Sequence, residues 1–306
     1  MSFSFDTKTE LCRIEPERDC CVKAECYGML LFARSFSRSG IALVTENRAV
    51  ARRAAELTVR ACGVIADVSA ALTRRRNSSY TLGVQTEHQR DEILRRFGYT
   101  GREISLRINR SNLENECCHA AFVRGAFLSC GTVTDPHKDY HLEFNVPFMN
   151  LAKDLMALLS EDETLNLQPA LINRKGAFVV YVKGSEHIAD LLAYLGAGGA
   201  AMELMQVRML KEVRNNVNRK TNFETANIDK TVSASVRQMK AIRRIETSIG
   251  LKALPDELRE TAELRYRNPE MSLRELGRML PEPISRSGVN HRLSRILKIA
   301  ENLKEP

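Results

Sequence analysis

The sequence predicts an α+β body built from two similar halves, followed by an all-α segment that ends in a small helical domain. Three observations carry this prediction. Landmark residues recur at a spacing of 97 or 98 across the first 200 residues, the charge turns basic in the last third, and short amphipathic helices separated by turns fill the end of the chain. We therefore divide the chain into two repeats, a basic helical linker and a terminal domain, with the bounds 1–100, 101–204, 205–250 and 251–306.

The two halves share a glycine-containing apolar helix and a later strand–helix pair. Gly28 in CYGMLLFAR matches Gly125 in VRGAFLSCG, and the segment 80–98 matches 178–196. Between these landmarks lie a strand pattern, IALVTEN or YHLEFNV, and a helix pattern, AVARRAAELTV or PFMNLAKDLMALL. Each half is therefore predicted to run helix, strands, helix, strands, helix. Both glycines would let the two first helices approach closely; alternatively they only loosen ordinary helices, at about 1 kcal/mol each relative to Ala.

The composition predicts a soluble protein of the cytoplasm. Hydrophobic residues make up 43% and charged residues 27% of the chain. The longest strongly apolar run, CYGMLLFA, is far shorter than the about 20 residues that a membrane-spanning helix needs, so no membrane partner is expected. The start of the chain shows no secretion signal, and the eight cysteines are expected to be reduced thiols in a cytosol.

The positive charge is concentrated in the last third of the chain. Residues 1–204 hold equal numbers of acidic and basic side chains, whereas residues 205–306 hold 21 Lys and Arg against 13 Asp and Glu. A basic segment attached to a neutral body favours a nucleic-acid partner, although a solvated basic surface would give the same count. This third contains only two aromatic residues, Phe223 and Tyr266, which counts against stacking on single-stranded bases.

No other motif predicts a metal, cofactor or catalytic site. The cysteines near the start and the pair Cys117 and Cys118 contain no C-x-x-C and no matched second pair, so zinc is not expected. We interpret DPHKDYH (135–141) as a turn entering a strand rather than a metal site. LGAGGAAM (195–202) is interpreted as a helix junction rather than a nucleotide loop.

The linker is predicted to form two helices, 200–220 and 227–248, around an asparagine-rich connector, NNVNRKTNFETAN. Apolar residues recur at helical spacing on the second helix and are interpreted as a docking face: Val232, Val236, Met239, Ile242, Ile245 and Ile249. The opposite side is either a phosphate-binding face or a solvated surface, and its basic residues are Lys230, Arg237, Lys240, Arg243 and Arg244.

Three short helices are predicted in the terminal domain. The first spans 256–267, between Pro255 and an Asn-Pro pair. The second, SLRELGRML, begins with a capping box in which Ser272 is the N-cap and Glu275 the third residue. The third, 286–303, follows the turn PEPIS. A tight polar turn before the third of three short helices is typical of a helix-turn-helix, which binds duplex DNA; a small module that binds protein is the alternative.

The periodicity of the third helix separates a packing face from a binding face. Val289, Leu293, Ile296 and Ala300 fall on one side. The N-terminal part of a recognition helix enters the major groove most deeply, so Ser287, Asn290 and His291 are predicted to read base edges, and Arg274, Arg286, Arg292 and Arg295 to contact phosphates. The full predicted DNA-binding set is Ser272, Arg274, Arg286, Ser287, Asn290, His291, Arg292, Ser294, Arg295 and Lys298.

VRGAFLSCG resembles the LAGLIDADG motif of homing endonucleases without a gap, with Gly125 in the third position and Gly131 in the ninth. CYGMLLFAR is a weaker second copy, with Gly28 in the third position. The resemblance implies that two motif helices pack at a pseudo-twofold axis and that the eighth residue of each is a metal-binding acid. Ala33 and Cys130 stand there instead. Because Mg²⁺ prefers carboxylate oxygens, we predict no nuclease activity and no enzyme; an active endonuclease with its ligands elsewhere is the competing reading.

Over nearly its whole length the chain resembles the WhiA family, most specifically in RGAFLSCGTVTDPHKDYHLEF, NNVNRKTNFETANIDK, LPDELRETAELR and ISRSGVNHRLSRI. The resemblance implies a transcriptional regulator linked to sporulation or to cell division and chromosome segregation, associated with the nucleoid. It also implies partners beyond double-stranded DNA, such as a WhiB-type iron-sulfur regulator or the transcription machinery. The alternative is a weakly specific architectural protein of the chromosome whose body binds proteins. The body's hairpin turns at Arg76 and Arg174 would offer a second, weak DNA surface, and its internal symmetry makes a monomer plausible.

Overall fold

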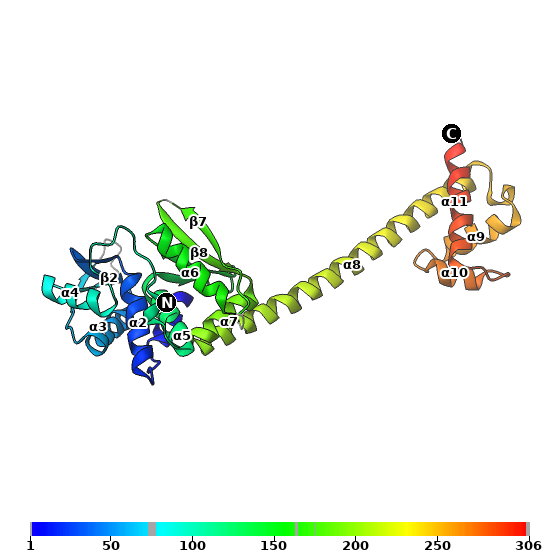
Figure 1. Ribbon diagram of the computed structural model, residues 1–306. Helices are drawn as coiled ribbons and strands as arrows, with labels where there is room; N and C mark the ends of the chain where they lie inside the picture. The colour runs from blue at the N-terminus through cyan, green and yellow to red at the C-terminus, as the bar shows by residue number, and fades with distance from the viewer. Residues whose placement is uncertain (1, 73–77, 163–164, 175, 304–306) are drawn as a thin grey trace. The chain divides into compact units, whose positions relative to one another are not determined.

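The computed structural model describes residues 2–72, 78–162, 165–174 and 176–303 (Figure 1). The chain divides into two compact units, Met1–Glu212 and Val213–Pro306. Both four-stranded sheets lie in the first unit, and the described part of the second unit contains helices only. No helix among the described residues combines the length and the apolar character that crossing a membrane requires.

Two halves of the first unit repeat one order of elements, which confirms the predicted duplication and the α+β class. The first half consists of α2 (Asp19–Leu31), β1 (Ser35–Ser37), β2 (Gly40–Thr45), α3 (Arg48–Cys62), β3 (Asp67–Leu72), β4 (Ser78–Gly83) and α4 (Glu87–Arg96). The second consists of α5 (Glu116–Cys130), β5 (Gly131–Val133), β6 (His141–Val146), α6 (Met149–Glu161), β7 (Ala170–Arg174), β8 (Ala177–Lys183) and α7 (Ser185–Leu195). A 3₁₀ turn, η1 (Arg110–Asn112), lies between the halves.

The two sheets have matching strand orders, β1-β2-β4-β3 and β5-β6-β8-β7, and every neighbouring pair is antiparallel. In the central strands alternate side chains face the core, so that Leu43 of β2 pairs with Leu82 of β4, and both are buried. Phe144 of β6 and Val180 of β8 are the equivalent buried pair in the second sheet. One face of each sheet therefore packs on helices, as the alternation in the sequence predicts.

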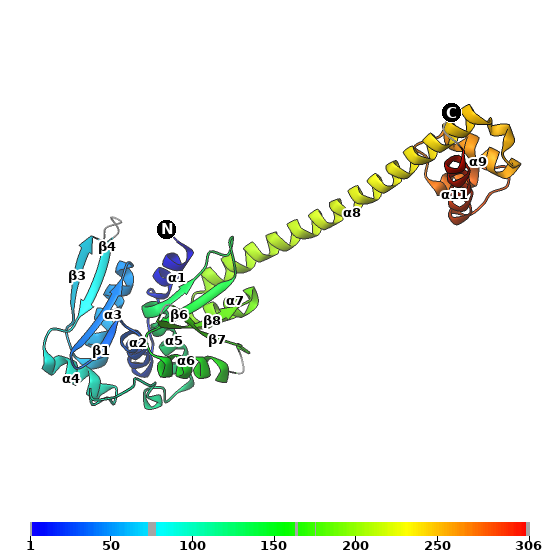
Figure 2. The same ribbon diagram turned by 90° about the horizontal axis from the view of Figure 1, so that it is seen from above.

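Helices α2 and α5 pack against each other between the two sheets (Figure 2). A Cβ atom on Gly28 would lie 2.2 Å from the carbonyl oxygen of Phe122, and one on Gly125 would lie 2.2 Å from that of Glu25. The two glycines are therefore required where one helix backbone touches the other, and they do not merely loosen their helices. This equivalence between the halves confirms the predicted close approach.

A buried ion cluster beside this crossing was not predicted. The carboxylate of Glu25, a fully buried residue of α2, accepts hydrogen bonds from Arg53 of α3 at 2.9 Å and from Arg124 of α5 at 2.9 Å. Arg124 also donates to the carbonyl oxygen of Leu195 at 3.0 Å. These hydrogen bonds link α2, α3, α5 and the end of α7. Because a buried charge without a partner is costly, the loss of any one member of the cluster would destabilise the body.

An N-terminal helix, α1 (Phe3–Leu11), precedes the repeats and was also not predicted. It begins at the N-cap Ser2, whose hydroxyl accepts a hydrogen bond from the amide of Phe5 at 3.2 Å. Phe3 and Leu11 are buried, and α1 contacts α3, α5 and β5. The helix has little amphipathic pattern, because Thr7 and Lys8 interrupt the apolar positions, and this explains why the sequence did not reveal it.

The prediction of two helices in the linker was wrong, because residues 198–248 form one helix, α8 (Gly198–Ser248). The asparagine-rich stretch 215–227 contains neither Gly nor Pro. Asn costs at most about 0.7 kcal/mol per residue relative to Ala in a helix, whereas starting a new helix is expensive, so a helix propagates through such a stretch.

The second unit forms its own core around α9 (Asp256–Arg267), α10 (Leu273–Met279) and α11 (Arg286–Asn302), with a 3₁₀ turn, η2 (Leu251–Ala253), before them. Ile242 and Ile245 of α8 are fully buried in this core. The predicted docking face is thus confirmed at these residues, whereas Val232, Val236 and Ile249 are exposed and Met239 is half-buried. The three predicted helices of the terminal domain are all present.

Candidate nucleic-acid interface

The second and third helices of the terminal domain are joined by a tight turn. Ser272 caps α10 in the predicted capping box with Glu275, and Ser285 caps α11 by accepting from the amide of Gly288 at 3.2 Å. Between them the amide of Ile284 donates to the carbonyl oxygen of Gly277 at 3.0 Å. A Cβ on Gly277 would lie 2.4 Å from the carbonyl oxygen of Ile284, so this turn requires glycine.

Helix α11 has the two predicted faces. Val289, Leu293, Ile296 and Ala300 are each at most 4% exposed and pack in the core of the second unit. Of the ten predicted DNA-binding residues, Arg292 and Ser294 are half-buried, and the other eight are exposed: Ser272, Arg274, Arg286, Ser287, Asn290, His291, Arg295 and Lys298. The apolar side of the helix is thus used for folding, which leaves the polar side available for a partner.

Four of the predicted residues meet around one pocket of about 410 Å³. Ser272 and Arg274 come from the start of α10, and Arg286 and Asn290 from the start of α11. Lys230 of α8, on the side of that helix predicted to be basic, also lines the pocket. Within the described residues neither Arg274, Arg286 nor Lys230 forms an ion pair with an acidic side chain. The pocket therefore gathers three exposed, uncompensated positive charges beside a neutral amide, and the buried guanidinium of Arg265 also lines it.

Two other predicted arginines are anchored by Glu257 of α9. Arg295 Nη1 lies 2.5 Å from Glu257 Oε1, and Arg292 Nη2 lies 3.8 Å from Glu257 Oε2. The side chain of Arg292 is only 17% exposed. These guanidinium groups are therefore held between α11 and α9, and a phosphate would have to compete with a carboxylate for them.

The remaining hydroxyl and basic residues of the predicted set lie on α11. The Ser287 hydroxyl lies 2.8 Å from that of Ser285, and Ser294 donates to the carbonyl oxygen of Asn290 at 2.8 Å. His291 and Lys298 have no hydrogen-bond or ion-pair partner in the part of the chain that the structure describes. Asn290, His291 and Lys298 thus present free polar groups.

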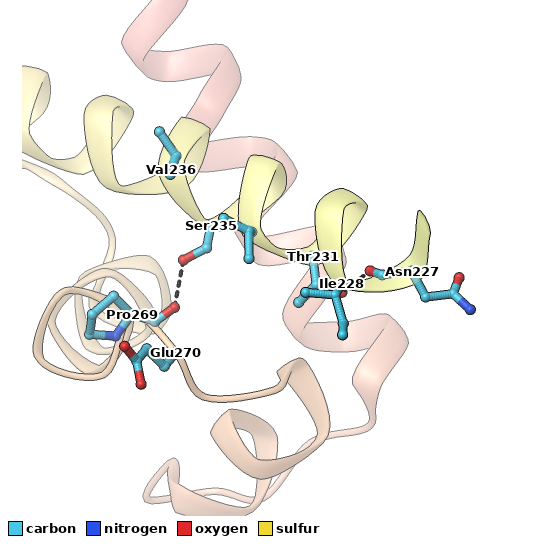
Figure 3. A pocket seen from close by; sticks show the side chains of 8 residues that line it. Asn227, Ile228, Thr231, Ser235, Val236, Pro269 and Glu270 are labelled. Carbon is cyan, nitrogen blue, oxygen red and sulfur yellow. Dashed lines mark hydrogen bonds between the residues drawn. The ribbon is translucent and has the colours of Figure 1, made fainter. Parts of the chain in front are cut away.

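A buried arginine, not predicted from the sequence, supports this arrangement. Arg265 of α9 is 2% exposed and donates to Gln238 Oε1 of α8 at 2.9 Å and to the carbonyl oxygen of Met271. Burial lowers the pKa of its guanidinium below the usual range. Nearby, Ser235 of α8 donates to the carbonyl oxygen of Pro269 at 2.6 Å (Figure 3). These bonds tie α8 to the segment that leads into α10.

Comparison with known proteins connects this geometry to a family. The model of the WhiA C-terminal HTH domain matches residues 217–300, and that of the WhiA LAGLIDADG-like domain matches residues 119–214. A probable cell division protein WhiA of Ruminiclostridium cellulolyticum is 42% identical over 315 residues, covering 100% of this chain and 99% of that protein. The protein of the same name from Alkaliphilus metalliredigens is 41% identical, covering 98% of each.

The chain belongs to the WhiA family. A crystal structure of full-length WhiA from Thermatoga maritima also matches, with a TM-score of 0.60, 26% identity and 100% of both chains covered. The predicted membership and fold class are therefore confirmed.

In this member of the WhiA family the motif positions expected to hold acids contain no hard metal ligand. Ala33 is buried and has no donor atom. Burial raises the pKa of the Cys130 thiol to about 12, so the thiol is neutral near pH 7. Lys8 of α1 donates to the carbonyl oxygen of Leu128 at 3.1 Å, close to the end of α5. An amine thus lies near the place where a cutting enzyme would need carboxylates.

The predicted second DNA surface of the body is only partly described. Arg174 at the end of β7 lies 3.4 Å from Glu143 Oε2 of β6, so its charge is compensated. Arg76 lies outside the described residues. The role of both in DNA binding remains a prediction.

Proposed function

We propose that this protein binds double-stranded DNA through the helix-turn-helix of its second unit and acts as a sequence-reading transcriptional regulator. One observation carries the proposal: Ser272, Arg274, Arg286 and Asn290, predicted separately from two helices, line one pocket with Lys230. Unpaired guanidinium and ammonium groups suit phosphate oxygens, and an adjacent amide at the start of α11 suits a base edge.

The biological setting of the proposal comes from the family. Relatives that share 39–42% identity over nearly the full chain carry the name probable cell division protein WhiA. We infer a role for this protein in cell division or sporulation, exerted in the cytoplasm at the nucleoid. A monomer is expected for the body, whose two halves already provide the pseudo-twofold packing at Gly28 and Gly125. A WhiB-type regulator or the transcription machinery would be the protein partner.

The body is proposed to be without nuclease activity. Two-metal cleavage of a phosphodiester needs ligands that hold the ions and activate water, and neither Ala33 nor the neutral thiol of Cys130 provides one. We expect no nicking or linearisation when the protein is incubated with plasmid and Mg²⁺ or Mn²⁺. Specific cleavage that is lost on mutation next to Cys130 would contradict this expectation.

Sequence reading is tested by competition between duplexes. The full chain would be used to enrich preferred duplexes from a random pool, and their affinity would be compared with that of random duplex at one fixed salt concentration. A regulator should favour its site by about 10³-fold or more. Equal affinities would instead support an architectural protein of the chromosome.

A further inference from the structure

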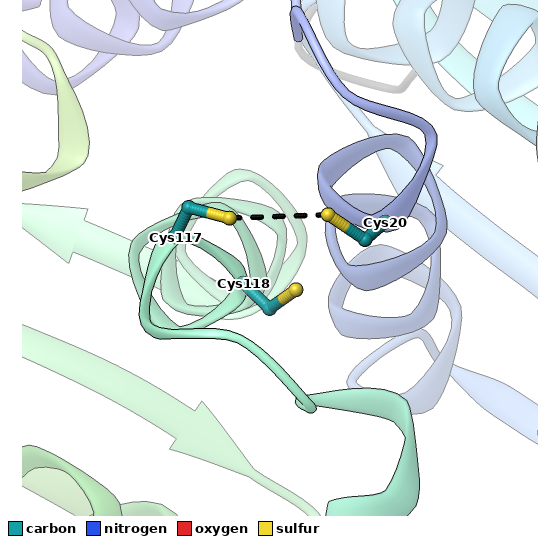
Figure 4. Close-up of side chains that lie close together, drawn as sticks. All are labelled: Cys20, Cys117 and Cys118. Carbon is teal, nitrogen blue, oxygen red and sulfur yellow. Dashed lines mark hydrogen bonds between the residues drawn. The ribbon is translucent and has the colours of Figure 1, made fainter.

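Four cysteines gather where the first turns of α2 and α5 meet. Cys20 and Cys21 lie at the start of α2, and Cys117 and Cys118 lie at the start of α5. The Sγ atoms of Cys20, Cys117 and Cys118 all lie within 4.8 Å of one another, and those of Cys20 and Cys117 are 3.8 Å apart (Figure 4). Cys21 Sγ donates to the carbonyl oxygen of Cys117 at 3.5 Å. All four are free thiols.

The internal repeat brings these thiols together. Cys20 and Cys117 are 97 residues apart, as are Cys21 and Cys118, and this is also the spacing of Gly28 and Gly125. The glycines hold the two helix backbones in contact. Each half therefore contributes one adjacent pair of cysteines to the place where the first turns of α2 and α5 meet. A search for C-x-x-C misses this set, because its two pairs come from equivalent positions of two repeats.

The spacing of the sulfur atoms suits a tetrahedral thiolate site. Four sulfurs bound to Zn²⁺ at about 2.3 Å lie about 3.8 Å from one another. The Cys20–Cys117 separation has this value. Thiolates are soft ligands, whereas Mg²⁺ and Ca²⁺ require oxygen ligands, which this cluster does not supply.

The surroundings of the cluster favour a bound ion. Cys118 is buried, whereas Cys20, Cys21 and Cys117 are half-buried, so an ion can enter from solvent. Arg18 Nη1 lies 3.8 Å from Cys117 Sγ and offers a positive charge to a thiolate. The site lies at the opposite ends of α2 and α5 from Ala33 and Cys130, so it is separate from the former nuclease positions.

We propose that Cys20, Cys21, Cys117 and Cys118 bind one Zn²⁺ that joins the first turns of α2 and α5. Three of the sulfurs already lie close together, and for Cys21 to be the fourth ligand its side chain would rotate away from the Cys117 carbonyl oxygen. Each thiol releases its proton to solvent on binding. The ion crosslinks the two halves of the body and does not depend on the DNA-binding proposal.

Cobalt provides the direct test. The full chain, reduced and stripped of metal with a chelator, is titrated with Co²⁺, which reports tetrahedral thiolate coordination by its visible absorption. We expect intense d–d and sulfur-to-metal bands that saturate at one Co²⁺ per chain and disappear when Zn²⁺ is added. Cys20→Ser and Cys118→Ser should weaken these bands strongly. Cys12→Ser, which changes a half-buried cysteine outside the cluster, should keep them.

Alkylation of the wild-type chain gives a second test that needs no variant. Bound Zn²⁺ should slow the reaction of Cys20 and Cys117 with iodoacetamide by about tenfold or more, as located by mass spectrometry. The proposal is overturned if wild type shows no tetrahedral bands, if Cys20→Ser leaves them unchanged, or if Zn²⁺ does not protect the two thiols. Formation of a Cys20–Cys117 disulfide in air at the same rate with and without Zn²⁺ would also overturn it, in favour of a redox pair.

Discussion

At the residue scale, the start of α11 holds the side chains proposed to recognise bases. Asn290 lines the basic pocket, and His291 is exposed next to it. Both have side chains that can donate and accept hydrogen bonds, so they can match base edges that present a donor and an acceptor side by side, whereas a phosphate offers acceptors only. Arg274 and Arg286 beside them are positively charged and offer hydrogen-bond donors only, so we expect them mainly to contact phosphates. Specificity and affinity should therefore respond to different substitutions.

Replacement of Asn290 or His291 by Ala should cost roughly 1–3 kcal/mol of binding free energy on a preferred duplex and less on random duplex, because only the preferred site offers matching base edges. Fluorescence anisotropy with both duplexes at one salt concentration measures the difference. If both duplexes lose the same free energy, these residues do not read bases.

Arg295 was predicted to contact phosphate and is paired with Glu257 in the structure. If it also serves DNA, Glu257→Gln should strengthen binding to all duplexes, because the competing carboxylate is removed. Arg295→Ala should weaken them alike and lower the salt slope by about one unit. If the slope of log affinity against log salt is unchanged in Arg295→Ala, this arginine does not contact phosphate and serves only to hold α11 against α9.

Gly28 gives a stability test with a matched control. A Cβ at this position would lie 2.2 Å from a backbone oxygen of α5, so Gly28→Ala should destabilise the protein by about 1–3 kcal/mol or more. At Gly198, the first residue of α8, a Cβ meets nothing within 4 Å, so Gly198→Ala should leave stability unchanged or raise it slightly. Urea unfolding compares the two variants. Equal effects would mean that α2 and α5 do not touch at Gly28.

Residues within one helix were predicted better than clusters between helices. Val289, Leu293 and Ile296 were correctly assigned to the buried face of α11, because helical periodicity alone determines that face. The Glu25–Arg124 pair and the Cys20–Cys117 pair join residues about one repeat apart, 99 and 97 residues. Such pairs can be predicted only when the two halves are aligned by their repeat, so that residues at equivalent positions are compared.

At the element scale, the repeats and the terminal helices followed from spacing, capping and turn residues. The exception is α8, where a run of asparagines suggested a break that is absent. Asn disfavours a helix only weakly, and no Gly or Pro interrupts residues 215–227. Helix α1 was missed for a related reason, because its fixed place depends on packing against α3 and α5 rather than on a strong pattern of its own.

The continuity of α8 can be tested inside the asparagine-rich stretch. Asn222→Pro removes a backbone hydrogen bond and introduces a clash, at a cost of about 3 kcal/mol in a helix interior, so the helical circular dichroism signal and the protection of amides 215–227 from hydrogen exchange should fall. Asn222→Ala at the same site should raise both. A proline variant with an unchanged signal would show that this stretch is not helical in solution.

At the scale of the whole molecule, charge and chemistry are divided between the two units. The basic excess lies in residues 205–306, which include the helix-turn-helix and its pocket of Arg274, Arg286 and Lys230. The body keeps the packing of an endonuclease-like repeat through Gly28 and Gly125 but lacks acids at the expected positions. This division could be predicted from the sequence, because the charge of a segment and the residues at motif positions are each read from one stretch of the chain. The sequence could not predict that α8, α10 and α11 contribute residues to one pocket, because that depends on how the helices pack.

The most direct test of the central claim is duplex-DNA binding by the full chain over a salt series. Wild type is compared with Arg274→Ala/Arg286→Ala and with a control, Lys252→Ala/Arg267→Ala, which removes the same charge from a different pocket of the second unit. We predict that the first variant binds all duplexes more weakly and that its plot of log affinity against log salt is less steep by about two units, while the control keeps the wild-type slope. An unchanged slope in the first variant, or an equal loss in the control, would contradict the proposed interface.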